Sequence, residues 1–544
     1  FEVAPMSKMK RAAALLLAMA SVFSLASCGT TDDGKKDDYI KGNNPGTVLG
    51  QTVAADDIFT LYCNRSYSMN PLIATNTNNQ LVCSLVYENM VEVDNSFKLN
   101  PGVVTSWTTS DGGSRWEFKV ASGHKFHDGQ QLTATDVAYS VMCAARSDRF
   151  KARLSYVAGC SATDSETFVV NLTKKNMQFP MLLTIPIIQY GTYEQAYPGG
   201  SGPYAYAEDY NSLVAAKTND YAAALPLQTI YLKEYVGTEE TISAFADSLI
   251  DVVLNDPSAN TNIGYGNANE IRAYNTTNMH YIGFSSHSGD FANEFIRFAM
   301  NYAIDRDYTV GQLGSYALAA TLPVSPASSL YNESYANQFK FSLNKVQEIL
   351  ANAGMKDYDG DGYLDIKNGE TIVKIDIDFL VYSGSTVKVN TAKKFAEDMK
   401  SLGLKVTVNK QDWKTYCQLI EAGNYDMYYA EVRMNSDFDP SKLLFTSAVL
   451  NYGQFSDTGL EEAITTYLTA DDDSRRTACD NMCAYIVNKA YIVPICFEKH
   501  QLISHRGVIE GIKVNENSPL GNVRDWSVTI ENVKPATNND DVKE

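Results

Sequence analysis

The sequence predicts an α/β protein, because short strands and helices alternate along the chain from Gln51 onward. Two segments carry this prediction. In residues 343–408, a helical pattern is followed by a strand, a second helix and a second strand. Strands separated by helices in this way pair in parallel, so this segment predicts a largely parallel sheet with crossover helices. Residues 100–141 form another unit of strand, turn and helix.

The composition limits the possible partners and chemistry. The chain has 544 residues, 44% of them apolar, which is enough material for more than one packed domain. Its 45 basic and 64 acidic side chains give a net charge of −19, and such a field repels nucleic acid. The sequence contains no HExxH, GxSxG or GxxxxGK[ST] motif. We therefore expect no catalytic residues, no cofactor, no resident metal and no nucleic-acid partner.

The N-terminal segment has the pattern of a secretory signal. Three basic residues precede an apolar run of 15 residues, 12–26, where a membrane-spanning helix needs about 20. Residues 1–27 are therefore predicted to be a signal peptide. Leu25 to Cys28 resembles the lipobox of bacterial lipoproteins, which implies acylation of Cys28. Several acyl chains anchor a protein firmly, so we expect it on the outer, extracytoplasmic face of the cytoplasmic membrane.

Two polar segments flank the predicted folded region. Residues 28–52 hold almost nothing apolar, so burial cannot offset their ordering entropy and we expect a flexible tether after the lipidated cysteine. Residues 532–544 form an equally polar tail.

The earlier of the two folded units has a strand and a capped helix. Trp116, Phe118 and Val120 alternate with polar residues, as in a half-buried strand. Thr133 with Asp136 three residues later resembles a capping box, which opens the helix that follows.

The later unit predicts two helices and two strands. A helix over 343–353 ends before Gly354, which lies where a helix C-cap is expected. A strand over 373–377, a helix over 392–399 and a strand over 404–408 follow.

The order of strand, turn, KFHDG and LTATDV in residues 100–141 closely resembles the signature of the family 5 extracellular solute-binding proteins. These are the oligopeptide- and dipeptide-binding subunits of ABC importers. The resemblance covers nearly all of residues 53–530. Further matching stretches are Ser201 to Tyr204, Tyr281 to Phe284, Ile296 to Asp307, and the segment around Trp413.

The resemblance implies a two-lobed, type II periplasmic-binding-protein-like clamp with an extra subdomain on lobe I. Such lobes close around a ligand by hinge motion. The extra subdomain is expected over residues 91–199 and lobe II over 284–496. Lobe I is expected to combine residues 53–90, 200–283 and 497–531.

In peptide-binding relatives, an aspartate of lobe II receives the amino terminus of the peptide, because a buried ammonium needs a carboxylate partner. The matching region is 425–440, where the chemistry indicates Asp437. Counting from the two ends of the region leads instead to Asn435 or to Ser436. A further alternative is that Asp437 and Asp439 only cap a loop.

Three more residues complete the predicted site. Trp413 matches a family tryptophan that can line the pocket, although simple packing is an equal alternative. Tyr382 is a similar case. A tryptophan common in relatives is absent here, and Arg433 lies in its neighbourhood. Ser285 stands where relatives often have asparagine, and such departures weaken the case for ordinary dipeptides. The predicted ligand-binding residues are thus Asp437, Asn435, Arg433, Trp413 and Tyr382.

Two patterns suggest metal sites, but simpler interpretations are favoured. Residues 357–365 resemble the first nine positions of a calcium loop, but the twelfth position is Asn368 and not the bidentate glutamate. A plain turn is the favoured interpretation. His124 and His127, three residues apart, are predicted to be structural or surface histidines and not a metal pair.

The cysteines leave a question open. Besides Cys28 there are eight, and eight cysteines allow 105 pairings, none of which the sequence selects. Cys479 and Cys483 are four residues apart in a predicted helix and are interpreted as buried small apolar residues.

The predicted function is that of a monomeric substrate-binding lipoprotein of an ABC importer. It would capture a peptide or peptide-like solute between two lobes and deliver it to a membrane permease driven by a separate ATPase, without covalent chemistry. Three alternatives stay open: a binding protein for an oligosaccharide or other non-peptide solute, a receptor for peptide signals, and a secreted hydrolase using the same clamp.

Overall fold

The computed structural model describes residues 58–235, 237–259 and 269–529. The predicted signal peptide, the lipidation at Cys28, the tether and the tail lie outside these residues. Within the described ranges, no helix is both long enough and apolar enough to cross a membrane.

One large mixed sheet of eleven strands runs through the molecule. Its order is β17 (Lys405–Gln411), β16 (Asp376–Tyr382), β18 (Met427–Arg433), β12 (Asn269–Phe284), β19 (Ile492–His505), β11 (Val252–Asn255), β1 (Thr60–Cys63), β10 (Thr229–Glu234), β9 (Ser212–Ala215) and β8 (Tyr204–Tyr206), with β13 (Ala317–Ala319) also paired to β19. The sheet is parallel around β16 and around β1, but β12 and β19 pair antiparallel with their neighbours. The predicted largely parallel sheet is therefore correct for the segment that suggested it and wrong for the sheet as a whole.

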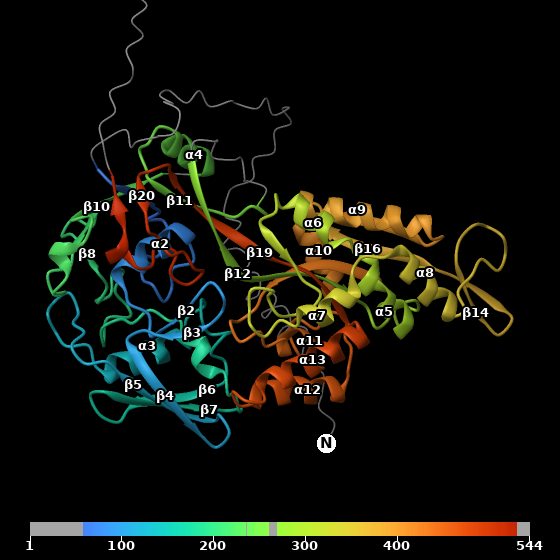
Figure 1. Ribbon diagram of the computed structural model, residues 1–544, viewed down its shortest axis with the longest axis horizontal. Helices are drawn as coiled ribbons and strands as arrows, with labels where there is room; N and C mark the ends of the chain where they lie inside the picture. Colours follow the sequence, from blue (N-terminus) through green and yellow to red (C-terminus); the bar gives the residue numbers. More distant parts are fainter. Residues whose placement is uncertain (1–57, 236, 260–268, 530–544) are drawn as a thin grey trace, which may run out of the picture.

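Two bodies lie side by side, and β12 and β19 cross from one to the other (Figure 1). Asn269 pairs with His505 in the first body, and Gly283 pairs with Ile492 in the second. The register of the two strands shifts between Asn275 and Met279, close to the crossing. A bulge of this kind bends and twists a strand, so the crossing is the natural place for a hinge.

The first body carries a separate four-stranded antiparallel sheet with a helix packed on it (Figure 1). The inward side chains of its β5 strand, Trp116, Phe118 and Val120, are buried as predicted. The backbone N–H of Thr133 donates to the Asp136 carboxylate at 2.9 Å, which confirms the predicted capping box. The elements are β4 (Val104–Ser110), β5 (Arg115–Val120), β7 (Thr167–Leu172), β6 (Val157–Ala162) and α3 (Ala134–Ala144).

The second body contains the later predicted unit. Helix α8 (Leu343–Asn352) is capped by Ala353, one residue before the predicted Gly354, which has φ of +80° and takes the left-handed position that follows a C-cap. Strands β16 and β17, which precede and follow helix α9 (Thr386–Ser401) in the sequence, are parallel neighbours in the sheet, as predicted.

One predicted strand is wrong. The alternation through residues 373–377 suggests one strand, but the chain makes an exposed hairpin, β14 (Asp365–Asn368) with β15 (Thr371–Lys374), before β16 begins. Val373 is 41% exposed, whereas Ile375 and Ile377 are buried. The alternation therefore runs across a junction between two strands with different surroundings.

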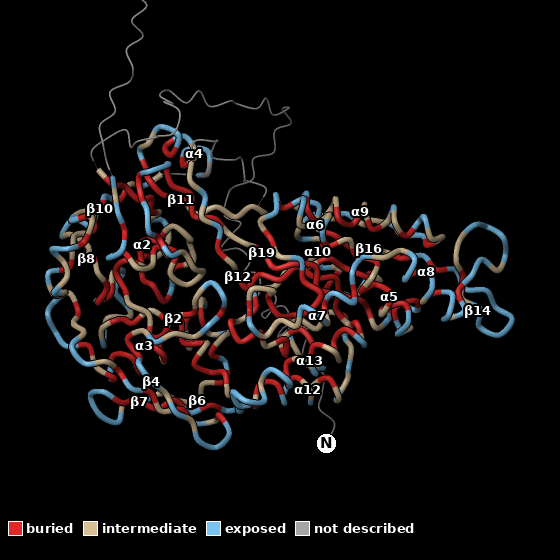
Figure 2. The backbone as a smooth tube through the Cα atoms, viewed as in Figure 1, coloured by how far each residue is buried: buried red, intermediate tan, exposed pale blue. Residues whose placement is uncertain are grey.

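Burial follows the two bodies, with buried backbone inside each and exposed loops around them (Figure 2). The remaining helices are α2 (Thr77–Val86), α4 (Thr238–Ala246), α5 (Glu294–Ala303), α6 (Arg306–Gln312), α7 (Glu333–Ala336), α10 (Trp413–Ala422), α11 (Ser441–Leu444), α12 (Thr458–Thr469) and α13 (Arg475–Lys489). The remaining strands are β2 (Val91–Val93), β3 (Leu99–Pro101), β20 (Ile509–Glu510) and β21 (Ser527–Val528).

The cysteines and the two histidines of the first unit have structural surroundings. Cys479 and Cys483 are buried in α13, as predicted, and all eight described cysteines are free. His124 Nδ1 lies 3.0 Å from the Glu88 carboxylate, and His127 Nε2 lies 3.0 Å from the Gly202 carbonyl.

The calcium-like loop holds a lysine among its carboxylates. Asp357 accepts hydrogen bonds from the backbone N–H groups of its own turn. The Lys374 ammonium contacts Asp359, lies 2.6 Å from Asp361 and 3.3 Å from Asp365. An internal cation therefore sits where a calcium ion would bind, consistent with the plain turn.

Candidate ligand-binding site

Three of the predicted site residues lie at one edge of the large sheet. Tyr382 ends β16, Arg433 ends β18, and Trp413 opens the helix that follows β17. Because β16 is parallel to both of its neighbours, these three strand ends meet at the same edge. In open α/β sheets, ligands bind outside the carboxyl ends of the strands.

Trp413 forms an aromatic group at this edge. Its ring lies 5.3 Å from that of Tyr382 at 76°, and it stacks on Tyr416 at 5.6 Å. The indole N–H of Trp413 is shielded from solvent and has no acceptor among the described residues. A buried indole N–H normally finds a partner, so this donor is free for a polar group of a ligand.

Arg433 joins the two bodies. Its guanidinium lies 2.9 Å from the carboxylate of Glu516, which belongs to the C-terminal segment of the first body. Glu516 also accepts a hydrogen bond from the backbone N–H of Thr277, at the bulge of β12. About half of the Arg433 side chain stays exposed, so the residue remains accessible to a solute.

Asp437 is a buried carboxylate without a cationic partner. It is 1% exposed and accepts hydrogen bonds from the Asn176 amide at 3.2 Å and from the Asp439 backbone N–H at 3.3 Å. Within the described residues, no Lys, Arg or His nitrogen lies within 4.0 Å of it. Burial, together with the charge of Asp439, raises the pKa of Asp437 to about 6. A cation bound beside it would stabilise the charged form.

The neighbouring residues have different roles. Asp439 accepts from the backbone N–H and hydroxyl of Ser441 at 2.8 and 2.9 Å, so the hydrogen bonds to the first residue of α11 come from Asp439, while Asp437 accepts from the backbone N–H of Asp439 itself. The backbone carbonyl of Asn435 accepts from Phe438, whose φ is +51°. This left-handed conformation costs energy for a residue with a Cβ and holds the loop in a sharp turn.

Parts of both bodies meet around Asp437. Asn176, which follows β7 in the first body, also donates to the Tyr156 hydroxyl at 2.7 Å. The Tyr467 hydroxyl, on α12 of the second body, donates to the backbone carbonyl of Asp437 at 2.6 Å. Phe97 and Phe438 make an edge contact between the bodies at 5.0 Å.

The crossing strands hold a charged network that the sequence reasoning missed. His280 on β12 and Glu498 on β19 are each 2% exposed or less, and His280 Nε2 lies 2.5 Å from Glu498 Oε1. Asn278 donates to the other carboxylate oxygen, and the Tyr429 hydroxyl lies 2.9 Å from His280 Nδ1. In the second body, His280 Nε2 and the Lys388 ammonium each lie 3.3 Å from Glu431.

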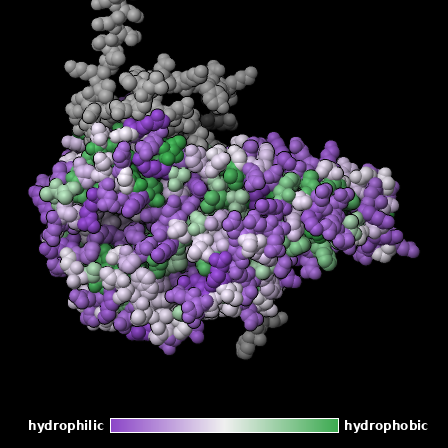
Figure 3. All heavy atoms as spheres, in the orientation of Figure 1, coloured by the Kyte–Doolittle hydropathy of each residue, from purple (hydrophilic) through white to green (hydrophobic). Residues whose placement is uncertain are grey.

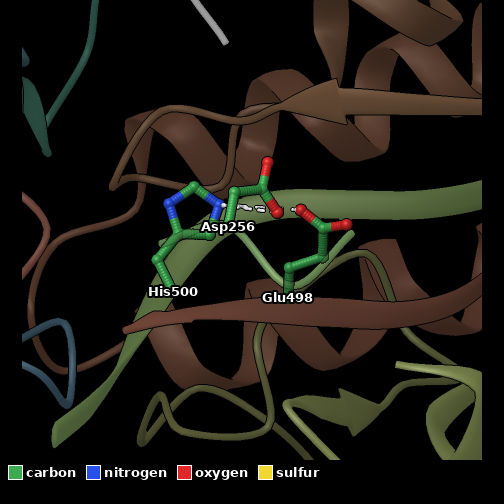
Figure 4. A group of neighbouring side chains, drawn as sticks. All are labelled: Asp256, Glu498 and His500. Carbon is green, nitrogen blue, oxygen red and sulfur yellow. Dashed lines mark ion pairs between the residues drawn. The ribbon is translucent and has the colours of Figure 1, made fainter. Parts of the chain in front are cut away.

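Glu498 also faces the first body, through His500. The His500 imidazole points between the carboxylates of Asp256 and Glu498, with Nε2 3.8 Å from an oxygen of each (Figure 4). Burial alone would lower the pKa of His280 and His500, but the neighbouring carboxylates outweigh it and raise both. Glu498 is therefore the shared anion of a network that spans the hinge.

A weak sequence signal marks this network. Glu498 and His500 are two residues apart in β19, so both project from the same face of the strand. Charged residues at such positions are rarely buried unless they are paired.

The outer surface of the view in Figure 3 is mostly hydrophilic, with apolar residues in small separate groups. A two-body α/β fold joined by two crossing strands, with aromatic and charged side chains gathered at one sheet edge beside the crossing, defines a two-lobed binding protein. The chain belongs to the bacterial extracellular solute-binding proteins, family 5, whose sequence profile ("family 5 Middle") matches residues 98–451.

Individual relatives agree with this assignment. The chain is 24% identical over 384 residues to the oligopeptide-binding protein AppA of Bacillus subtilis, spanning 66% of this chain and 69% of that protein. It is 26% identical over 320 residues to the glutathione-binding protein GsiB of Escherichia coli, spanning 55% and 62%. The unliganded open form of the periplasmic murein tripeptide-binding protein MppA has the same fold, with a TM-score of 0.70 and 18% identity over 88% of this chain and 99% of that one.

Proposed function

We propose that this protein captures peptides or peptide-like solutes between its two lobes and delivers them to the permease of an ABC importer. The observation that carries the proposal is the buried carboxylate of Asp437, which has no cationic partner among the described residues. A peptide ammonium would supply that partner through charge-assisted hydrogen bonds.

The aromatic group supports the same proposal. Trp413 and Tyr382 offer apolar faces for the side chains of a peptide, and the free indole N–H of Trp413 offers a donor to a backbone carbonyl. The names of the relatives, which bind oligopeptides, glutathione and a murein tripeptide, agree with a ligand of this class.

Delivery requires a position outside the cytoplasm. We propose that the mature chain is acylated at Cys28 and held on the outer face of the cytoplasmic membrane. There it would pass its solute to the permease, which a separate ATPase drives. Mass spectrometry of the membrane-extracted protein would test the anchor, since acylation adds the mass of the fatty acyl and glyceryl groups to the peptide that begins at Cys28.

A non-peptide solute is the second possibility, and the Trp413–Tyr382 group favours it, because sugars also stack on exposed aromatic faces. Native mass spectrometry of the protein purified under mild conditions separates the two. Co-purified peptides give a series of masses that differ by amino-acid residues. A single mass, or a series that differs by hexose units, would reject peptides as the natural cargo.

A further inference from the structure

Three side chains near the hinge converge without making hydrogen bonds to one another. Asp256 directly follows β11 in the first lobe, while Glu498 and His500 lie on β19. The Nε2 atom of His500 lies 3.8 Å from an oxygen of each carboxylate (Figure 4). This nitrogen is shielded from solvent and has no hydrogen-bond partner among the described residues. Buried polar atoms are normally paired, so this nitrogen is available for another partner.

The distances within this group suit a shared metal ion. A direct hydrogen bond from nitrogen to oxygen spans about 2.7 to 3.2 Å, so 3.8 Å is too long for one. Two metal bonds of about 2.1 Å separate their ligand atoms by about 3.4 Å in a tetrahedral site and by at most about 4.2 Å. One ligand atom from each of Asp256, Glu498 and His500 lies within 4.8 Å of the other two. A single ion can therefore reach all three after small side-chain rotations.

Two other groups of acidic side chains within the described residues show what a closed arrangement looks like. In one, His280 Nε2 lies 2.5 Å from Glu498, which leaves no room for an ion between them. In the other, the acidic loop of residues 357–365 already holds the ammonium of Lys374. The wider spacing around His500 distinguishes its group from both.

Neighbouring side chains hold both carboxylates in position. Asp256 accepts hydrogen bonds from the backbone N–H and the hydroxyl of Ser258, both at 2.8 Å. Glu498 accepts one from the Asn278 amide at 2.5 Å and lies 2.5 Å from His280. Carboxylates that bind metal ions are commonly fixed by hydrogen bonds of this kind. A carboxylate has about four lone-pair sites, so these contacts leave room for a metal bond.

The donor set indicates the kind of ion. One imidazole nitrogen with two carboxylate oxygens suits Zn²⁺ and related divalent transition metals, whereas Ca²⁺ and Mg²⁺ prefer oxygen ligands alone. Three protein ligands leave a fourth position for water. The side chains of Asp256 and His500 are 14% and 15% exposed, so an ion and its water can enter from their side.

We propose that Asp256, Glu498 and His500 form a binding site for a divalent transition-metal ion, for which Zn²⁺ is the best fit. Glu498 lies opposite the bulge of β12, where the register of the crossing strands shifts. The ion would join the segment after β11 to β19 at this point. It would therefore stabilise the first-lobe side of the hinge, whatever solute the protein captures. Asp256 is far from the other two ligands in the sequence, so no local motif indicates the site.

The first test locates zinc in the unmodified protein and needs no variant to fold. Crystals of the protein, prepared without a histidine tag, are soaked in zinc chloride, and anomalous scattering at the zinc absorption edge shows where the ion lies. We expect a peak within about 2.3 Å of His500 Nε2 and of one oxygen of each carboxylate. Zinc at other positions only, or no bound zinc, would overturn the proposal.

Calorimetry in solution gives an independent measurement. After treatment with a chelator and its removal, the unmodified protein should bind one Zn²⁺ at this site. Zinc should also raise the melting temperature, because it binds the folded state. His500→Gln and Asp256→Asn should each weaken zinc binding at least about tenfold. The matched control is His287→Gln, an exposed histidine of the second lobe, which should leave the affinity unchanged.

The variants separate this site from adventitious binding. Zinc binding that both variants keep would identify an adventitious ion only and overturn the proposal. Normal binding by Asp256→Asn alone would exclude the first-lobe ligand and overturn the site as proposed. A cooperative melting transition of each variant without zinc shows that a loss of binding is not a loss of structure. Peptide capture is measured separately, by tripeptide binding in the presence of a chelator.

Discussion

His280 and Glu498 face each other on the two strands that connect the lobes, with 2.5 Å between imidazole nitrogen and carboxylate oxygen. Both are buried, so each stabilises the charge of the other in surroundings that water does not reach. Removing one partner leaves the other charge uncompensated. Glu498→Gln should therefore lower the free energy of unfolding by about 3 to 5 kcal/mol in urea titrations. The exposed Glu510→Gln is the control, and a loss of similar size there would contradict the role of the pair.

The same pair predicts how stability depends on pH. The pKa of His280 is raised by folding. Its contribution to the free energy of unfolding is therefore complete below about pH 6.5 and is lost as the pH rises through the folded-state pKa. Burial alone would raise the pKa of Glu498, but His280 holds it well below its usual value. The contribution of Glu498 to the free energy of unfolding is complete above about pH 4.3 and is lost as the pH falls through the folded-state pKa. The stability difference between the unmodified protein and His280→Gln should thus be largest between about pH 4.3 and 6.5. A difference that is flat across pH would contradict the pairing.

Asp437 is predicted to bind the ligand ammonium. Asp437→Asn should weaken the natural ligand by about 2 to 5 kcal/mol in calorimetry, because the substitution leaves the ammonium buried and unpaired. Affinity should also fall below about pH 6, where the carboxyl group becomes protonated. The neighbouring Asp439→Asn is the comparison: it removes the charge that raises the pKa of Asp437 but keeps the Asp437 carboxylate, so it should retain ligand binding. Unchanged affinity in Asp437→Asn would reject the role.

Gly283 on β12 is predicted to accept no side chain. A Cβ at this position would lie 2.3 Å from the ring of Tyr428, which is 2% exposed and has little room to move. Gly283→Ala should lower the free energy of unfolding by about 1 to 3 kcal/mol. Gly159→Ala is the comparison, because nothing lies within 4 Å of a Cβ there. Equal effects of the two substitutions would contradict the steric argument.

The acidic loop at Asp357 is predicted not to need calcium. Lys374 already neutralises Asp359 and Asp361, so the melting temperature should be the same with added calcium and with a chelator. Lys374→Met removes the internal cation and leaves three exposed carboxylates facing one another. Calcium should then raise the melting temperature of the variant only. A rise in the unmodified protein would show that calcium displaces the lysine.

Local patterns were enough to predict the elements of the first unit and the parallel pairing of β16 with β17, because spacing and capping act over a few residues. The strand over 373–377 was wrong because alternation does not reveal where a hairpin leaves the core. The family resemblance selected Trp413 and Tyr382 as pocket residues, but no local pattern could show that their rings meet. The contact of Asp437 with Asn176 joins residues 261 positions apart, and no local pattern predicts such a pair.

The two crossing strands also determine how the chain is divided. The second lobe is inserted between them, and the residues that flank the insertion, Gly283 and Ile492, are neighbours in one ladder. A short linker at this point would join β12 to β19 as an ordinary hairpin, with little entropy needed to close it. The chain therefore leaves the first lobe and returns to it at neighbouring positions of one ladder, so the path of the first lobe does not depend on the length of the segment between them.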